Sequence, residues 1–245
     1  MSRPLDLLFL GSGNAFAAGR YWSSFLLNGR YLFDASPIAL PHLKRAAVAL
    51  DDIEAVFISH FHADHFFGLP FLLLEYAEIT KRTNPLTIVG PPTIEERLKT
   101  LTKVGFPHLF EKERSYEIRY VELADGATGR VGDLTFTSRA VEHVDEFGCF
   151  GFRVELDGRA LAYSGDTVMC DALADLARGA DVFVVECSCW EERCGTVHLG
   201  MDDIRALRKE LGPTPAFVLT HLDPGERDLG IDNVQYASDL ARLSF

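Results

Sequence analysis

The feature that most constrains this chain is the run SHFHADH at residues 59–65, which puts three histidines and an aspartate into one short peptide. The stretch before it, Ala55–Ile58, is short and apolar, as is typical of a buried strand. The segment after it, Phe66–Lys81, has helical length, and Pro70 lies near its start, where a helix tolerates proline. The run therefore predicts a fold in which a buried strand gives way to a helix and presents polar side chains at the junction.

The spacing within this run favours metal binding. Residues two apart in an extended segment project to the same side, so His60 and His62 can hold one ion together. Asp64 and His65 fall where the chain turns into the helix and can reach a second ion. Imidazole nitrogens combined with a carboxylate suit zinc, iron or manganese. A surface or core role accounts for most single histidines, but it does not account for four ligands at this spacing.

Three more potential ligands, His143, Asp166 and His221, each follow a strand-like apolar stretch. Ligand sites in open α/β sheets lie outside the carboxyl ends of the strands. We therefore expect these three side chains to lie at strand ends, as the histidine run does.

The remaining pattern indicates how the chain is organised. It contains no internal repeat, low-complexity tract or linker, so we expect one domain over residues 1–245. Asn28-Gly29 between two short apolar stretches is a strong hairpin signal, and residues 117–162 are rich in strand patterns. Helices are expected at Thr93–Val104, Met169–Arg178 and Asp202–Leu211. The whole predicts an α/β (α+β) fold in which two packed sheets have helices outside them.

Composition narrows the location and the partners. Lys and Arg number 24 against 36 Asp and Glu, a net charge of −12, which argues against broad nucleic-acid binding because such binding needs cations to replace counterions. The apolar segments are too short for a signal peptide or a membrane span. Five cysteines, an odd number, fit free thiols in a reducing compartment. We expect a cytoplasmic protein with no membrane partner.

The sequence also resembles a known family. HFHADH, His143, the SGDT motif at residues 164–167 and the THL motif at residues 220–222 resemble the metallo-β-lactamase fold superfamily over nearly the whole chain. The resemblance implies a four-layer αββα sandwich of two mixed β-sheets with two divalent metal ions, Zn or Mn, between them. It implies that one ion is held by His60, His62 and His143, the other by Asp64, His65 and His221, and that Asp166 bridges them.

Within that superfamily the chain is similar to the branch of tRNase Z and the small phosphodiesterases, which includes the phosphonate-pathway cyclic phosphodiesterase. The resemblance implies that His198, an additional histidine, lies near the leaving oxygen and acts as an acid or a phosphate binder. The gap between His143 and Asp166 is too short for the arm with which tRNase Z grips tRNA. The segment Asp34–Pro37 also departs from the pattern of the tRNA processors.

We therefore predict a dinuclear metal-dependent hydrolase that cleaves a nucleotide or another small phosphate diester through metal-bound hydroxide. Asp64 would orient or deprotonate the nucleophile and His198 would help the leaving oxygen depart. The first alternative is a tRNase Z-like endoribonuclease with RNA as partner, and the second is a lactone, thioester or carboxylic ester hydrolase. A mononuclear iron oxidoreductase is the alternative from another class.

Three secondary expectations concern the rest of the chain. Cys187, Cys189 and Cys194 form a cluster that could hold a structural zinc, although small buried thiols are also common in cores. Glu186 could orient His198 or a metal ligand. The segment Phe66–Ile79 has more apolar residues than one buried face needs, and family resemblance implies a homodimer with this segment near the contact.

Overall fold

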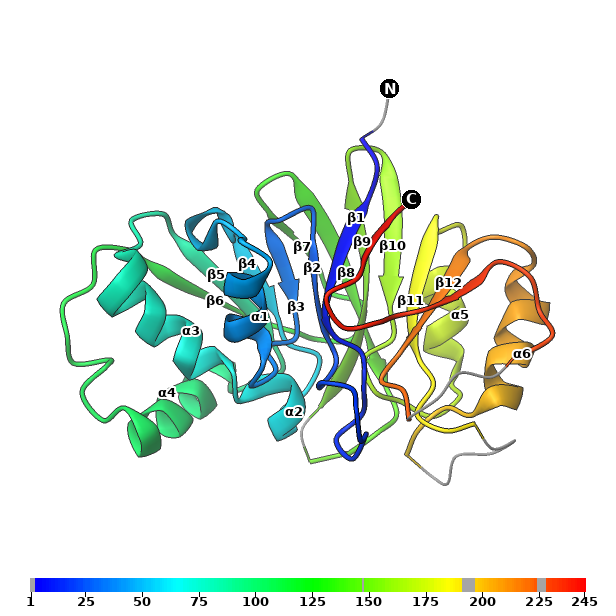
Figure 1. The fold of residues 1–245 in the computed structure, drawn as a ribbon, viewed down its shortest axis with the longest axis horizontal. Coiled ribbons are helices and arrows are strands. Elements are labelled where there is room, and N and C mark those ends of the chain that lie inside the picture. Colours follow the sequence, from blue (N-terminus) through cyan, green and yellow to red (C-terminus); the bar gives the residue numbers. More distant parts are fainter. Residues whose placement is uncertain (1–2, 147, 191–196, 224–227) are drawn as a thin grey trace.

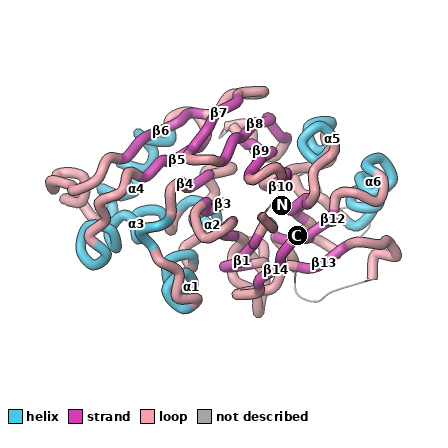
Figure 2. The backbone as a smooth tube through the Cα atoms, turned by 90° about the horizontal axis from the view of Figure 1, so that it is seen from above, coloured by secondary structure: helices cyan, strands magenta, loops and turns pink. Residues whose placement is uncertain are grey.

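The computed structural model describes residues 3–146, 148–190, 197–223 and 228–245, and over these the chain forms two seven-stranded sheets that face each other (Figure 1). The first sheet has the order β14-β1-β2-β3-β4-β5-β6 and the second the order β13-β12-β11-β10-β9-β8-β7. Helices cover the outer face of each sheet, with α1, α3 and α4 on one side and α5 and α6 on the other (Figure 2). The predicted four-layer αββα sandwich is confirmed.

The elements have the following bounds. The first sheet is built from β1 (Asp6–Gly11), β2 (Ser24–Leu27), β3 (Tyr31–Phe33), β4 (Ala55–Phe57), β5 (Leu86–Gly90), β6 (Ile118–Glu122) and β14 (Arg242–Ser244). The second is built from β7 (Thr128–Val131), β8 (Leu134–Val141), β9 (Cys149–Leu156), β10 (Arg159–Tyr163), β11 (Val182–Glu186), β12 (Ala216–Thr220) and β13 (Val234–Tyr236). The helices are α1 (Ala39–Arg45), α2 (Ala63–Phe66), α3 (Leu69–Glu75), α4 (Ile94–Gly105), α5 (Asp171–Ala177) and α6 (Met201–Leu211), with helical turns η1 (Leu50–Asp52) and η2 (Tyr76–Thr80).

Alternation along the strands builds the layers. Successive side chains of a strand point to opposite faces of its sheet. In β1, Leu7 and Phe9 pack into the core between the two sheets, whereas Leu8 and Leu10 pack under α1 and α3. Because strands such as β1 are apolar on both faces, they are buried between two layers, as the sandwich requires.

Parallel pairing brings several strand ends together. Strands β3, β4, β5 and β6 run parallel in the first sheet, and β10, β11, β12 and β13 run parallel in the second. The carboxyl ends of β4, β10, β11 and β12 lead directly into the segments that carry the polar residues of interest. This edge of the sandwich is therefore where ligand-binding side chains are expected to meet.

Most predicted elements are confirmed. The hairpin turn at Asn28-Gly29 has φ values of 48° and 70°, the left-handed conformations that a type I′ turn requires. The helix expected over Phe66–Lys81 is instead divided into α2, α3 and η2. The break falls at Gly68, whose amide donates to the Ala35 carbonyl and where a Cβ atom would lie 2.0 Å from the Ser36 carbonyl oxygen. No described helix is long and apolar enough to span a membrane.

Candidate metal centre

The site lies at the strand ends that the two sheets share. The loop after β4 and the short helix α2 carry His60, His62, Asp64 and His65. The loops after β8, β10 and β12 carry His143, Asp166 and His221, respectively. In the described part of the chain, three groups of potential ligand atoms each lie within 4.8 Å of one another. They are His60, His62, His143 and Asp166; Asp64, His65 and His221; and Asp166, His198 and His221.

Asp166 stands at the centre of these groups. Its Oδ2 atom lies 3.2 Å from the Nε2 atoms of both His65 and His221. The same oxygen lies 3.8 Å from Nε2 of His60 and 4.0 Å from Nε2 of His143. One buried carboxylate thus faces histidines from both sheets, which is the position that a bridging ligand needs.

Outer partners turn two of the histidines toward this centre. His65 and His143 donate their Nδ1–H groups outward, to Asp34 over 2.8 Å and to the Val197 carbonyl over 2.7 Å. Their Nε2 atoms therefore point inward, which is how an outer partner normally orients a metal-binding imidazole. Nε2 of His65 and of His221 is buried yet makes no hydrogen bond. Such unsatisfied buried atoms are rare in proteins and fit an ion.

The electrostatics agree with this. Burial, reinforced by neighbouring histidines, lowers the pKa of His60 and His62. Burial also lowers the pKa of His143. These three imidazoles are neutral, the form in which histidine binds metal. Burial alone would raise the pKa of Asp166, but its attraction to His221 and His65 outweighs burial and holds that pKa well below its usual range. Burial would likewise lower the pKa of His65, but Asp166 and Asp34 outweigh it and raise that pKa well above its usual range.

A buried carboxylate, Asp34, supports the ligands on the side of the first sheet. It accepts the Nδ1–H of His65 directly, and it accepts the Ser59 hydroxyl at 2.9 Å. Ser59 in turn lies 3.0 Å from Nδ1 of His60, so the serine links a second histidine to the same carboxylate. The Tyr163 hydroxyl donates to Asp34 from the opposite sheet over 2.6 Å. Asp34 has a φ of 55°, an uncommon backbone conformation for a residue other than glycine. Such strained conformations are often found at functional sites.

Glu186 has the same arrangement in the second sheet. It accepts the Nδ1–H of His198 at 2.9 Å and the hydroxyl of Ser188 at 2.8 Å. Ser188 lies 2.6 Å from Nδ1 of His221, so this carboxylate also holds one histidine directly and one through a serine. Burial would lower the pKa of His198, but the hydrogen bond to Glu186 together with the negative charges of Glu186 and Asp166 outweighs it and raises that pKa to about 8. The backbone amide of Thr167, next to Asp166, donates to Glu186 as well.

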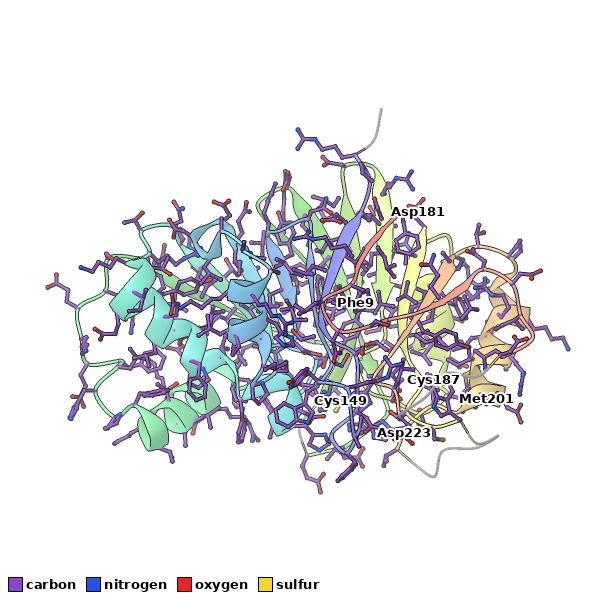
Figure 3. The ribbon with its side chains drawn as sticks, in the orientation of Figure 1. Phe9, Cys149, Asp181, Cys187, Met201 and Asp223 are labelled. Carbon is purple, nitrogen blue, oxygen red and sulfur yellow. The ribbon has the colours of Figure 1, made fainter. Side chains whose placement is uncertain are left out.

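A pocket of about 570 Å³ opens onto this centre. Its walls include candidate ligands from both sheets and residues of the loop that follows β1. The lining residues are Asn14, Ala15, Phe16, His62, Ala63, Asp64, Asp166, Ser188, Cys189, His198, His221 and Asp223. Asp223 and Cys187 lie at this end of the sandwich, whereas Asp181 lies at the opposite end (Figure 3).

Every residue predicted for the site thus lies near the centre, but the cysteine cluster is different. Cys187 is a free buried thiol, and Cys189 forms a disulfide, so Cys189 is not available as a thiolate. Cys194 lies outside the described residues. The expectation of free thiols thus holds for Cys149, Cys170 and Cys187 but not for Cys189.

Sequence reasoning did not find Asp34, Ser59, Ser188 and Tyr163 as parts of the site. Two of them stand next to a recognisable motif: Ser59 opens the histidine run, and Tyr163 precedes the SGDT motif. Asp34 carries no local signal, because its partners His65 and Tyr163 come from distant parts of the chain. Ser188 lies two residues after Glu186, but its link to the ligand His221 spans 33 residues.

Comparison with known proteins places the chain in a family. Residues 29–222 match the family described as beta-lactamase superfamily domain. A ribonuclease Z from Methanosarcina mazei is 27% identical, over 98% of this chain and 97% of its own length. The metallo-beta-lactamase fold protein YhfI from Bacillus subtilis superposes with a TM-score of 0.80 at 20% identity, covering 99% of this chain and all of its own. A diphosphatase of the PhnP family superposes with a TM-score of 0.74 at 19% identity, over 98% of each chain.

The chain therefore belongs to the beta-lactamase superfamily, with the metallo-β-lactamase fold. Its cluster of histidines and aspartates suits divalent metal ions. Together with the relatives, this makes the protein a metal-dependent hydrolase.

Proposed function

We propose that this hydrolase is a dinuclear phosphodiesterase that acts on nucleotides or other small phosphate diesters. The observation that carries the proposal is the pair formed by His198 and Glu186 beside the ligand cluster. Its histidine lines the pocket, and its ring centroid lies 4.9 Å from that of His143 and 5.1 Å from that of His221. A protonated imidazole here can reach an oxygen that leaves from phosphorus.

The two ions would be held by separate sets of residues. His60, His62 and His143 form the first set, Asp64, His65 and His221 form the second, and Asp166 faces both. Two zinc or manganese ions in such a site would activate a water and neutralise charge on the phosphoryl oxygens. Asp64 lines the pocket, and its Oδ2 lies 3.5 Å from Nε2 of His65 and 3.6 Å from Nε2 of His221. This position suits a carboxylate that also orients the attacking water.

His198 would supply the proton that the leaving oxygen needs. Glu186 accepts its Nδ1–H, which leaves the Nε2 side of the ring for substrate. The carboxylate also favours the protonated imidazole, because the hydrogen bond and the negative charge stabilise the cation. A positioned acid of this kind is worth about 10²–10⁴-fold in rate.

Several observations favour a small substrate over tRNA. Strands β9 and β10 are joined by a tight turn at Asp157-Gly158, so only a short hairpin separates His143 from Asp166. The alignment with the Methanosarcina mazei ribonuclease Z runs over 304 positions although this chain has 245 residues, so that relative carries additional segments. The net charge of −12 also disfavours a polyanionic partner.

A tRNase Z-like endoribonuclease is the second candidate. The match to a ribonuclease Z over nearly the full length of both chains favours it. In this case the pocket would receive an RNA end, and the same residues would act on one internucleotide bond.

We extend the proposal to the cellular location and the oligomeric state of the protein. We place the protein in the cytoplasm as one domain over residues 1–245. We expect a homodimer with the segment Phe66–Ile79 near the contact, because this segment exposes the apolar side chains Phe67, Phe71 and Ile79. A sedimentation mass near that of one 27.2 kDa chain at micromolar concentration would contradict the dimer.

A substrate panel tests the proposed activity. Bis(p-nitrophenyl) phosphate, 2′,3′-cyclic nucleotides, a precursor tRNA, a homoserine lactone and a thioester are assayed with Zn²⁺ and with Mn²⁺, alongside metal analysis. We expect the small diesters to be turned over fastest and two ions per chain. Preferred cleavage of tRNA would support the second candidate. Opening of the lactone or thioester without diester turnover would reject both, and a single iron per chain would indicate an oxidoreductase.

A further inference from the structure

We propose that Phe16 is a stacking platform for the nucleobase of the substrate, so that the preferred diester carries an aromatic base next to the scissile phosphate. This inference rests on the proposed phosphodiesterase activity and names its substrate class. Phe16 lines the same pocket as His62, Asp64 and His198, on the loop between β1 and β2.

The exposure of this side chain is unusual for its position. Phe16 is 94% exposed, although the fold buries most of its other phenylalanines in the layers described above. A large apolar ring that is held in water beside a polar site loses the stabilisation that burial would give it. A flat ligand that covers the ring would recover that stabilisation, and nucleobases stack on aromatic side chains irrespective of sequence.

The loop that carries Phe16 is fixed in place. The Asn14 side chain accepts the Phe16 amide at 3.0 Å and donates to Asp223 at 2.8 Å and to the Ser188 carbonyl at 3.3 Å. Asn14 is itself buried, and it thereby ties the loop to the segments that carry Ser188 and His221. Because the backbone that carries the ring is already held relative to the ligand cluster, stacking costs little ordering of the loop.

The chemistry of the pocket agrees with a base at this place. Ala15, Phe16 and Ala63 form an apolar part of the lining, whereas the ligand residues and His198 form the polar part. A diester whose phosphate faces the polar part places one of its substituents against the apolar part. A planar, uncharged ring can pack against this apolar part of the lining, and a nucleoside diester carries such a ring.

The test compares two diesters with the same leaving group. The metal-loaded full-length protein is assayed with the p-nitrophenyl ester of thymidine 5′-phosphate and with methyl p-nitrophenyl phosphate, which lacks the base. Loss of one base–aromatic stack is worth about 5- to 150-fold. We expect Phe16→Ala to lower kcat/KM for the thymidine ester by about that factor and to leave the methyl ester nearly unchanged. Phe16→Trp should retain the preference for the thymidine ester.

Tyr21→Ala is the matched control. Tyr21 is an exposed aromatic residue of the same loop, but its ring packs on His42 and does not line the pocket. We expect this variant to keep the preference for the thymidine ester. Equal losses on both esters in Phe16→Ala, or no loss on either, would overturn the stacking proposal while the phosphodiesterase activity stands. If the unmodified protein hydrolyses neither ester, the proposed function fails and the stacking proposal fails with it.

Discussion

The two sheets contribute to the centre in different ways. The first sheet supplies four candidate ligands from one continuous peptide after β4, whereas the second supplies three from separate loops after β8, β10 and β12. A continuous peptide sets the spacing of its ligands through local geometry. Separate loops set theirs through the packing of three strands, so the second half of the site depends on the whole fold.

The two supporting carboxylates differ as well. Asp34 is buried, and its partners His65, Ser59 and Tyr163 are also buried. Glu186 is equally buried, but one of its partners, His198, lines the pocket. Asp34 therefore faces ligand histidines, while Glu186 faces one ligand histidine and the candidate acid. The comparison suggests that metal retention and proton transfer are supported by different carboxylates.

The largest loss of metal and of turnover is expected when Asp166, which faces both ligand sets, is replaced. Asp166→Ala removes the one carboxylate, among the residues that the structure describes, that faces both ligand sets, so both ions should be lost together. Turnover should fall on the order of 10³-fold or more, because metal stabilisation of the transition state supplies several kcal/mol. Metal content and kcat are measured on the same preparation. Asp181→Ala, at the opposite end of the sandwich (Figure 3), is the control. Retention of one ion in Asp166→Ala would mean that the carboxylate serves a single half.

The next effect separates chemistry from metal binding. We expect His198→Ala to keep its metal content while turnover falls by about 10²–10⁴-fold on a diester with a poor leaving group. With p-nitrophenolate as the leaving group the loss should shrink, because this oxygen needs little protonation. Kinetics on both diesters and metal analysis check this. Equal losses on good and poor leaving groups would limit His198 to phosphate binding, and loss of an ion would make it a ligand.

The comparison of the two carboxylates is tested by a pair of isosteric variants. Asp34→Asn should weaken metal binding by about 10- to 100-fold, the usual effect of removing an outer partner of a ligand. Glu186→Gln should lower turnover by a similar factor, about 10- to 100-fold, with a smaller change in metal affinity. Chelator competition and kinetics at saturating metal distinguish the two. If Glu186→Gln loses metal as readily as Asp34→Asn does, the division of labour between the carboxylates is wrong.

Local and distant interactions explain what the sequence could and could not predict. The histidine run, the Asn28-Gly29 turn and the alternating strand patterns depend on neighbours along the chain, and each is found in the structure. The break in the segment after the run was missed because it depends on the approach of Gly68 to the backbone at Ala35, more than thirty residues away.

Other elements have weak local signals. The edge strands β13 and β14 have three residues each, too few for a recognisable alternation. Helix α1 contains Pro41, which obscures its pattern although proline is tolerated in a first turn. Asp34 could not be recognised as part of the site, because its hydrogen bond from Tyr163 joins the residue after β3 to a strand of the opposite sheet. The ligands after β8, β10 and β12 were recognised as potential ligands because each follows a strand-like stretch, but their assignment to particular ions came from family resemblance.

The smallest effects are expected at the two serines. Ser59 links His60 to Asp34, and Ser188 links His221 to Glu186. Ser59→Ala and Ser188→Ala therefore each remove the hydrogen-bonded link between one ligand histidine and its supporting carboxylate. A single hydrogen bond contributes about 0.5–1.5 kcal/mol net, which corresponds to roughly a 2- to 10-fold loss in affinity. Because His60 and His221 belong to different ligand sets, the two variants should weaken different steps of a two-ion titration followed by calorimetry.

Ser23→Ala is the control for this last pair. Ser23 is equally buried, but its hydroxyl pairs with that of Thr220 and not with a histidine. It should therefore leave both steps of the titration unchanged. If Ser59→Ala and Ser188→Ala weaken the same step, the two halves of the centre share their ions more closely than the separate ligand sets imply. The carboxylates would then have to be treated as supports of one joint site.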